Sequence, residues 1–299
     1  MIEPDHRGAS ADGHASTGEG GGNNLLLRVA SAVILAPAVL LCTYVGGWVF
    51  LALCAVAAGV ILWEWTSLVG GSGNLGILAP GWTTLLAATL LIGFGRSADM
   101  ALGVIAFGAI LAAIAMATWP GSPAPRVAPA WAAGGIVYAA MVLFGPCLLR
   151  QDPEWGLTAL LFLFATVWAT DIFAFFCGRA IGGPLLWPRI SPKKTWSGAL
   201  GGLVGGVAAG IGVAYASGVD ELGLVGLVGS ALSLLAQTGD LFESAVKRRF
   251  GAKDASHLIP GHGGLMDRID GFLVAAFAGL LIGLIHQGIT APARGLLIW

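Results

Sequence analysis

The chain has 299 residues, of which 57% are hydrophobic and 10% charged, with a formal net charge of −1 and a mean hydropathy of +0.84. A soluble domain carries about 25% charged residues, so this composition excludes a water-soluble enzyme with a single core. A disulfide-rich scaffold is also excluded, because the four cysteines stand singly within apolar runs and are interpreted as small buried hydrophobic residues. The composition indicates a polytopic membrane protein.

The predicted elements begin with a polar tail and continue as long apolar stretches. Residues 1–24 are rich in Gly, Ala and Ser, and are expected to form a disordered cytosolic tail and not a signal peptide. Each later stretch is long enough to cross a hydrocarbon core of roughly 30 Å as a helix. These stretches lie at residues 27–45, 48–69, 77–95, 98–118, 130–149, 156–178, 198–216, 222–242 and 269–289. We therefore predict an all-α integral membrane protein with about nine transmembrane helices, divided into residues 25–150 and 151–299.

The distribution of Lys and Arg predicts the orientation of these helices. If the N-terminus is cytosolic and nine spans follow, twelve of the fifteen Lys and Arg residues fall on the cytosolic side. Only Arg96, Arg150 and Arg294 fall on the other side. This asymmetry is the one that the positive-inside rule describes, so we expect a cytosolic N-terminus.

Two long cytosolic loops, predicted at 179–197 and 243–268, hold nine of the fifteen cations. The first contains the run SPKKT, in which Lys193 and Lys194 stand between the hydroxyls of Ser191 and Thr195. Pro192, with Ser191 as the cap, is expected to begin a helix whose positive N-terminus faces an anion. An ordinary basic loop that only orients the protein is the alternative. The glycines that follow at every fourth position, from Gly198 to Gly210, indicate close helix packing.

Acidic residues near the cytosolic ends of the predicted helices are candidate functional groups, because each costs roughly 2.5–3.5 kcal/mol to insert into a membrane. Glu64 is interpreted as a snorkelling or pairing carboxylate at a helix end, and Asp171 is open to either a structural or a functional interpretation. Asp240, Asp267 and Asp270 are interpreted as functional because of the residues around them.

The stretch from Gln237 to Asp270 combines carboxylates, cations and glycines. Asp240, Asp267 and Asp270 are hard oxygen ligands that suit Mg²⁺, with Glu243 and Ser244 as further candidates. Cations such as Lys247 suit phosphate, and glycines free backbone N–H groups to face an anion. The predicted catalytic residues are Asp240, Lys247, Asp267 and Asp270. The predicted substrate-binding residues are Ser191, Lys193, Lys194, Thr195, Arg248, Lys253, Asp254, His262, Gly263, Gly264 and Arg268. His257 is interpreted as a surface residue, and zinc is excluded for want of a third soft ligand. Carboxylates that hold a metal ion, together with cations and backbone amides that bind phosphate, are the groups that phosphoryl or nucleotidyl transfer requires.

The run from Ser244 to Asp270 resembles the signature of the phosphatidate cytidylyltransferases, also called CDP-diacylglycerol synthases. The matching positions are Ser244, Lys247, Arg248, Lys253, Asp254, Ser256, Pro260, His262, Gly263, Gly264, Asp267, Arg268 and Asp270. The motifs TDIFAFFCGR (170–179), SPKKT (191–195) and QTGD (237–240) are also similar to those of the family. One position departs from it, because Ser197 stands where family members commonly carry an acid.

This resemblance implies a homodimeric enzyme of the cell (plasma or inner) membrane, with its active site facing the cytosol. Such an enzyme converts CTP and phosphatidate to CDP-diacylglycerol and pyrophosphate in phospholipid biosynthesis. It implies that Asp240 and Asp267 are the principal ligands of Mg²⁺, with Asp270 and Ser244 as contributors, and it leaves room for a second cation. The implied partners are CTP, phosphatidate and membrane lipids, and nucleic acid is not among them.

Two other functions stay open. A CTP-dependent lipid kinase of the polyprenol type needs a similar set of cations and carboxylates. An ion-coupled transporter also carries intramembrane acids and helices interrupted by glycine. The transporter is disfavoured because no inverted repeat is visible and the polar residues gather at one edge of the membrane.

Overall fold

The computed structural model describes residues 33–69, 75–118, 129–259 and 263–299. Within these ranges, eight helices are long and apolar enough to cross a membrane. They are α2 (Gly47–Val69), α3 (Leu75–Gly93), α4 (Ala98–Thr118), α5 (Pro129–Arg150), α6 (Gly156–Ile181), α7 (Trp196–Ala216), α8 (Leu222–Arg249) and α9 (Met266–Gln287). They confirm the polytopic, all-α class and eight of the nine predicted spans.

The beginning of the chain is described only in part. The first predicted span, residues 27–45, is described only as the shorter apolar helix Val33–Val45. The predicted tail, residues 1–24, lies outside the described residues. A short helix that the sequence did not predict, α10 (Pro292–Leu297), follows α9.

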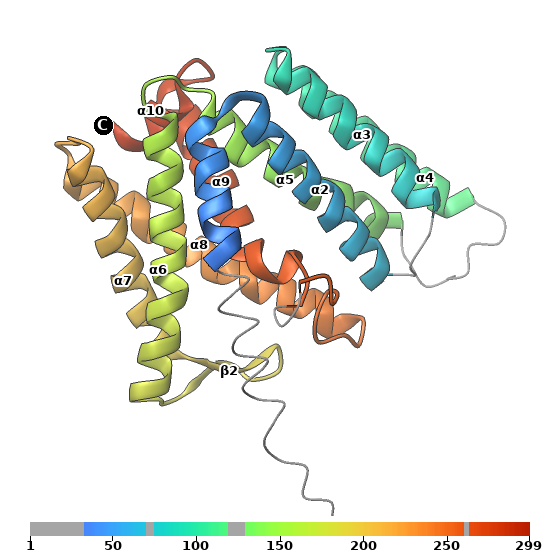
Figure 1. Cartoon of the computed structure of the whole chain (residues 1–299). Coiled ribbons are helices and arrows are strands. Elements are labelled where there is room, and N and C mark those ends of the chain that lie inside the picture. The colour runs from blue at the N-terminus through green and yellow to red at the C-terminus, as the bar shows by residue number, and fades with distance from the viewer. Residues whose placement is uncertain (1–32, 70–74, 119–128, 260–262) are drawn as a thin grey trace, which may run out of the picture.

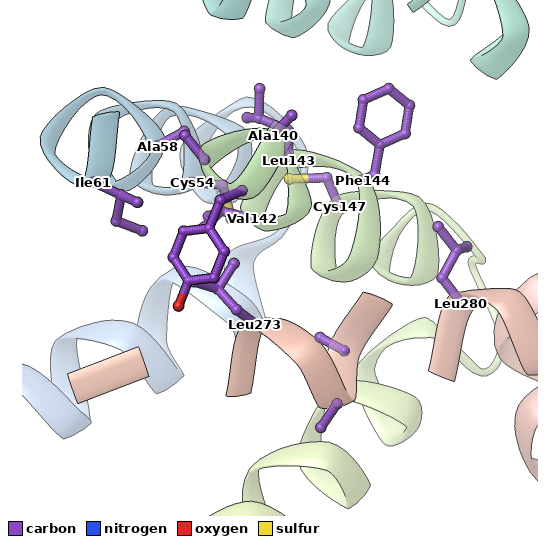
Figure 2. Packing of buried hydrophobic residues seen from close by; sticks show 14 of the residues in the cluster. Cys54, Ala58, Ile61, Ala140, Val142, Leu143, Phe144, Cys147, Leu273 and Leu280 are labelled. Atoms are coloured by element: carbon purple, nitrogen blue, oxygen red, sulfur yellow. The ribbon is translucent and has the colours of Figure 1, made fainter. Parts of the chain in front are cut away.

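Helix α5 forms the centre of the bundle and is the most buried of the eight spans. It packs against α2, α4 and α9, while α3 and α4 lie together on one side and α6 and α7 on the other (Figure 1). Small and aliphatic side chains fill the contact of α2, α5 and α9, among them Ala58, Leu143 and Leu273 (Figure 2). Cys54 and Cys147 are buried in this core, as expected, whereas Cys42 and Cys177 are half-buried, and all four cysteines are free thiols.

Helices α6 and α7 approach each other through the predicted glycine stripe. A Cβ atom added to Gly198, Gly202 or Gly206 would stand 2.7–2.8 Å from a backbone carbonyl oxygen of α6. That distance is shorter than real Cβ contacts, so only glycine allows the two backbones to pack this closely. The packing interpretation of these glycines is confirmed.

A β-hairpin takes the place of most of the first predicted loop, 179–197. Helix α6 continues to Ile181, and Gly182 and Gly183, with φ of +67° and +100°, turn the chain into the hairpin. Strand β1 (Leu185–Trp187) pairs antiparallel with β2 (Ser191–Thr195). The hairpin projects from the end of the bundle where α6 finishes (Figure 1).

The expectation that Ser191 caps a helix beginning at Pro192 is wrong. Both residues lie in β2, and α7 begins at Trp196 with Thr195 as its cap, whose Oγ1 accepts a hydrogen bond from the Gly198 amide at 3.1 Å. A two-stranded sheet has only edge strands, which tolerate a proline that lacks an N–H group.

The second loop is also shorter than the predicted 243–268. Helix α8 continues to Arg249 and α9 begins at Met266, so the connection is residues 250–265, of which 260–262 lie outside the described residues. The last turn of α8 carries Lys247, Arg248 and Arg249, and cations are favoured there because a helix C-terminus bears partial negative charge.

Candidate active site

A cavity of about 780 Å³ lies where α6 and α8 finish and α7 and α9 begin. Its acidic and basic lining includes Asp171 from α6, Lys193 and Lys194 from β2, Asp240 from α8 and Asp270 from α9. The remaining predicted site residues that line it are Ser191, Thr195, Lys247, Asp254, Asp267 and Arg268. The fold thus brings basic residues of the hairpin and of α9, and acidic residues of α6, α8 and α9, to one cavity.

The hairpin presents the SPKKT residues to this cavity. Lys194 forms an ion pair with Asp240 Oδ2, which links β2 to α8. Ser197, the position where the sequence departs from the resembled family, donates a hydrogen bond of 2.5 Å from its Oγ to the carbonyl oxygen of Gly182. Its Oγ also lies 3.0 Å from Thr195 Oγ1. Ser197 therefore fastens the start of α7 to the end of α6.

Asp240 is the more accessible of the two acids expected to bind metal most strongly. Its side chain is 34% exposed, against 6% for Asp267. Ser244, one helical turn further along α8, donates a hydrogen bond of 3.5 Å to Asp240 Oδ1. Ser244, which the sequence named as a contributor to metal binding, is therefore close enough to Asp240 to share a ligand with it.

Lys247 lies between two carboxylates that are almost fully buried. Its Nζ is 2.6 Å from Glu243 Oε2 and 2.5 Å from Asp267 Oδ1, and the side chain is 12% exposed. The sequence suggested a phosphate-binding cation at this position. In the structure this ammonium group joins α8 to the first turn of α9.

Asp267 also binds backbone amides. Its Oδ2 accepts hydrogen bonds from the amides of Ala255, at 3.0 Å, and Gly264, at 2.8 Å. With Lys247 on Oδ1, both carboxylate oxygens have partners within the protein. Asp267 thereby holds α8, residue 255 and the start of α9 together.

The glycines of the predicted signature do not offer their amides to a ligand in this structure. Gly263, at a φ of +86°, donates to the carbonyl oxygen of Ile259 at 3.1 Å, and Gly264 donates to Asp267. His262 and Pro260 lie outside the described residues. His257 is exposed, as expected. Arg248 donates to the carbonyl oxygen of Ala252 at 3.2 Å, and Lys253 is exposed.

Glu64 is the residue whose environment differs most from its sequence interpretation. It is fully buried in α2, where the sequence suggested a snorkelling or pairing carboxylate. Its Oε1 accepts hydrogen bonds from Ser256 Oγ, at 2.6 Å, and from the Leu265 amide, at 2.8 Å. Its Oε2 accepts from the Met266 amide at 2.6 Å. A residue of the N-terminal half therefore contacts the signature directly.

Two cavity residues, Arg179 and Gln237, were not assigned a binding role from the sequence, and Glu243 was named there only as a further oxygen ligand. Arg179 adds a cation, and Gln237 donates from Nε2 to the carbonyl oxygen of Ala199 at 3.3 Å. Each stands in an otherwise apolar helix, so the rarity of polar groups in membrane spans was the signal that could have identified them.

The donor set fits a magnesium ion that is completed by substrate. Within the described ranges, no group of three or more His, Cys, Asp or Glu side chains forms a metal-binding cluster. Mg²⁺ usually takes only one or two carboxylates and fills its octahedron with water and substrate phosphates. Asp240 and Asp270 line the cavity and could supply those carboxylates.

Comparison with known proteins gives one consistent result. The cytidylyltransferase family matches residues 26–285 of the chain. A phosphatidate cytidylyltransferase of Brucella suis biovar 1 is 40% identical over 272 residues, which are 91% of this chain and 97% of the relative. The protein of that name from Haemophilus influenzae is 32% identical over 279 residues, with 83% and 94% covered. The Bacillus subtilis protein of the same name is 36% identical over 160 residues, with 50% and 58% covered.

Proposed function

This chain belongs to the cytidylyltransferase family, and we propose that it transfers the cytidylyl group of CTP to phosphatidate, forming CDP-diacylglycerol and pyrophosphate. The relatives that carry this name span almost the whole chain. The observation that carries the proposal is the cavity, in which Lys193, Lys194 and Arg268 stand together with Asp240 and Asp270 at one end of a membrane-spanning bundle.

The proposed reaction joins two anions, so its first obstacle is electrostatic repulsion. Two unit charges 4 Å apart repel by about 4 kcal/mol at an effective dielectric constant of 20, and several such pairs meet when two phosphate groups approach. The cavity is lined by cations from four elements, and those outside α8 are Arg179 in α6, Lys193 and Lys194 in β2, and Arg268 in α9. Cations held in place before the reaction stabilise the encounter without reorganisation.

The proposed chemistry is a single displacement at phosphorus. A phosphate oxygen of phosphatidate forms a bond to the α-phosphorus of CTP, and the bond from that phosphorus to the bridging oxygen of the β-phosphate breaks. Pyrophosphate leaves with the electron pair. The transfer needs no covalent enzyme intermediate, so the protein contributes positioning and charge neutralisation.

Magnesium is part of the proposal. Asp240 and Asp270 would hold the ion, with Ser244 beside Asp240. When bound, Mg²⁺ neutralises phosphate charge and orients the phosphate groups. Asp267 would mainly hold α8 and the start of α9 in position and would not be the main ligand of the ion, because Lys247 and two amides already bind its oxygens.

We further propose that the protein lies in the cell (plasma or inner) membrane with this cavity facing the cytosol, and that it is a homodimer. The positive-inside rule supports the orientation, because the cavity end of the bundle carries the hairpin lysines and the basic last turn of α8. Such a location lets CTP arrive from water while the acyl chains stay in the bilayer. Size measurement of the purified protein in detergent tests the dimer.

Labelled CTP tests the proposed reaction directly. Purified protein in detergent is given phosphatidate and CTP labelled at either the α- or the γ-phosphate, with and without Mg²⁺. We expect α-label in the lipid fraction only when Mg²⁺ is present, and γ-label only in released pyrophosphate. Label entering lipid from the γ-position alone would instead identify a CTP-dependent lipid kinase. Solute flux in proteoliposomes without CTP turnover would identify a transporter.

A further inference from the structure

The buried carboxylate of Glu64 lies against the start of α9, although the two are far apart in the sequence. Helices α2 and α9 both pack against α5, and they also contact each other. Leu265, the cap residue of α9, has no side-chain capping bond of its own. Its amide and that of Met266 donate instead to Glu64, 201 and 202 residues earlier in the chain.

Glu64 therefore does for α9 what a capping side chain does within a single helix. The first amides of a helix have no partner inside it and carry partial positive charge. An anion that accepts hydrogen bonds from two of these amides gives them partners and neutralises part of the positive charge. The same bonds compensate the cost of burying a carboxylate in a membrane protein. Glu64 stabilises the start of α9 from another part of the fold.

Glu64 also holds the segment that leads into α9. Ser256 Oγ donates to Glu64 Oε1 at 2.6 Å and accepts from the Leu258 amide at 3.1 Å. The amides of residues 264, 265 and 266 point at just two carboxylates, with Gly264 bound to Asp267 and the next two bound to Glu64. Glu64 and Asp267 together fix the chain at residues 255–256 and 264–266.

We propose that Glu64 is a positioning residue for the active site. It does not line the cavity. It sets the start of α9, and with it Arg268 and Asp270, and it sets the segment that carries Asp254, all three of which do line the cavity. This inference rests on the proposed cytidylyl transfer.

The substitution that isolates this effect is Glu64→Gln. The glutamine carbonyl oxygen can still accept from Ser256 and Leu265, but its NH₂ group then faces the donor N–H of Met266. The negative charge at the helix start is lost as well. The matched control is Thr66→Val in the same helix, because Thr66 is 1% exposed and its hydroxyl donates only to the Leu62 carbonyl oxygen of α2, at 2.7 Å.

Two measurements on the full chain in detergent test the proposal. The first is the separation of kcat from KM. We expect the KM for CTP or for phosphatidate to rise at least tenfold in Glu64→Gln, and both KM values to change less than twofold in Thr66→Val. The second is the rate of trypsin cleavage after Lys253, which is exposed in the segment that Glu64 holds. We expect this rate to rise at least tenfold in Glu64→Gln alone.

The outcomes separate the inference from the proposed reaction. Unchanged KM values for both substrates in a folded Glu64→Gln protein, an unchanged cleavage rate, or equal effects in Thr66→Val each overturn the positioning proposal. Wild-type protein that transfers no cytidylyl group overturns the proposed function instead, and the trypsin measurement then still decides whether Glu64 holds the segment.

Discussion

Replacing Lys247 by methionine tests whether its ammonium group is chiefly an internal clamp. Methionine keeps the length of the side chain and removes the charge that lies 2.6 Å from Glu243 and 2.5 Å from Asp267. Those two side chains are only 2% and 6% exposed, so two carboxylates would be left facing each other with little access to water. Removing one partner of a buried ion pair destabilises a protein by about 3–5 kcal/mol.

This magnitude converts into a measurable shift in thermal unfolding. For a chain of roughly this size, each kcal/mol lowers Tm by about 2–4 °C, so we expect Lys247→Met to lower Tm by about 6–20 °C. The assay is thermal unfolding of the purified protein in one detergent at one scan rate. Lys253→Met is the control, because Lys253 is an exposed cation in the following segment and its loss should shift Tm by less than about 2 °C.

A double variant distinguishes lost pairing from lost side-chain packing. In Lys247→Met combined with Glu243→Leu, one of the stranded carboxylates is gone, and replacing a buried pair by apolar residues is often close to neutral. We expect the double variant to recover at least half of the Tm lost in the single variant. A Tm for Lys247→Met within 2 °C of wild type would refute the reasoning, since it would mean that the two carboxylates do not need this cation.

Three further predictions concern the cavity and the helix packing around it. Asp240→Asn should lower cytidylyl transfer at least 100-fold at saturating Mg²⁺ while elution volume and Tm persist, and near-normal turnover would remove its role in metal binding. Lys193→Ala should raise the KM for CTP or phosphatidate by about tenfold, the effect of losing roughly 1.4 kcal/mol of binding, and unchanged substrate dependence would count against β2 as a phosphate site. Gly202→Ala should lower Tm, because the added Cβ would stand 2.7 Å from the Thr170 carbonyl oxygen. Gly212→Ala is the control and should leave Tm unchanged, because its Cβ would have no atom within 4 Å. Equal shifts in the two variants would contradict the close approach of α6 and α7.

The membrane spans were predictable because each span depends only on the hydrophobicity of neighbouring residues in the sequence. A helix that crosses a bilayer needs a long apolar run, and such runs are visible in any window of the sequence. The glycine stripe of α7 was predictable for the same reason, since its four-residue spacing places Gly198, Gly202 and Gly206 on one helical face.

The boundaries at the membrane edge were less predictable because hydropathy marks the lipid boundary and not the end of a helix. Helix α8 continues through Lys247 and Arg249 after its apolar stretch has ended. The hairpin was missed because its strands are short and Pro192 is equally compatible with the first turn of a helix and with an edge strand.

The site residues were predictable as a set of chemical types but not as a set of contacts. Carboxylates, cations and glycines within one stretch indicated phosphate and metal chemistry, yet nothing in the sequence pairs Lys194 with Asp240. Glu64 was assigned a minor role because its partners lie 192–202 residues away, and only the folded chain brings them together.

The distance in sequence between Glu64 and its partners has a consequence for biosynthesis. At about 5–20 residues per second, the ribosome makes Ser256 and the start of α9 roughly 10–40 s after it makes Glu64. During that interval the Glu64 carboxylate lacks the donors that later surround it. The hydrogen bonds that tie α2 to the start of α9 therefore form only after most of the chain has been synthesised, so this part of the membrane scaffold is completed together with the reaction centre.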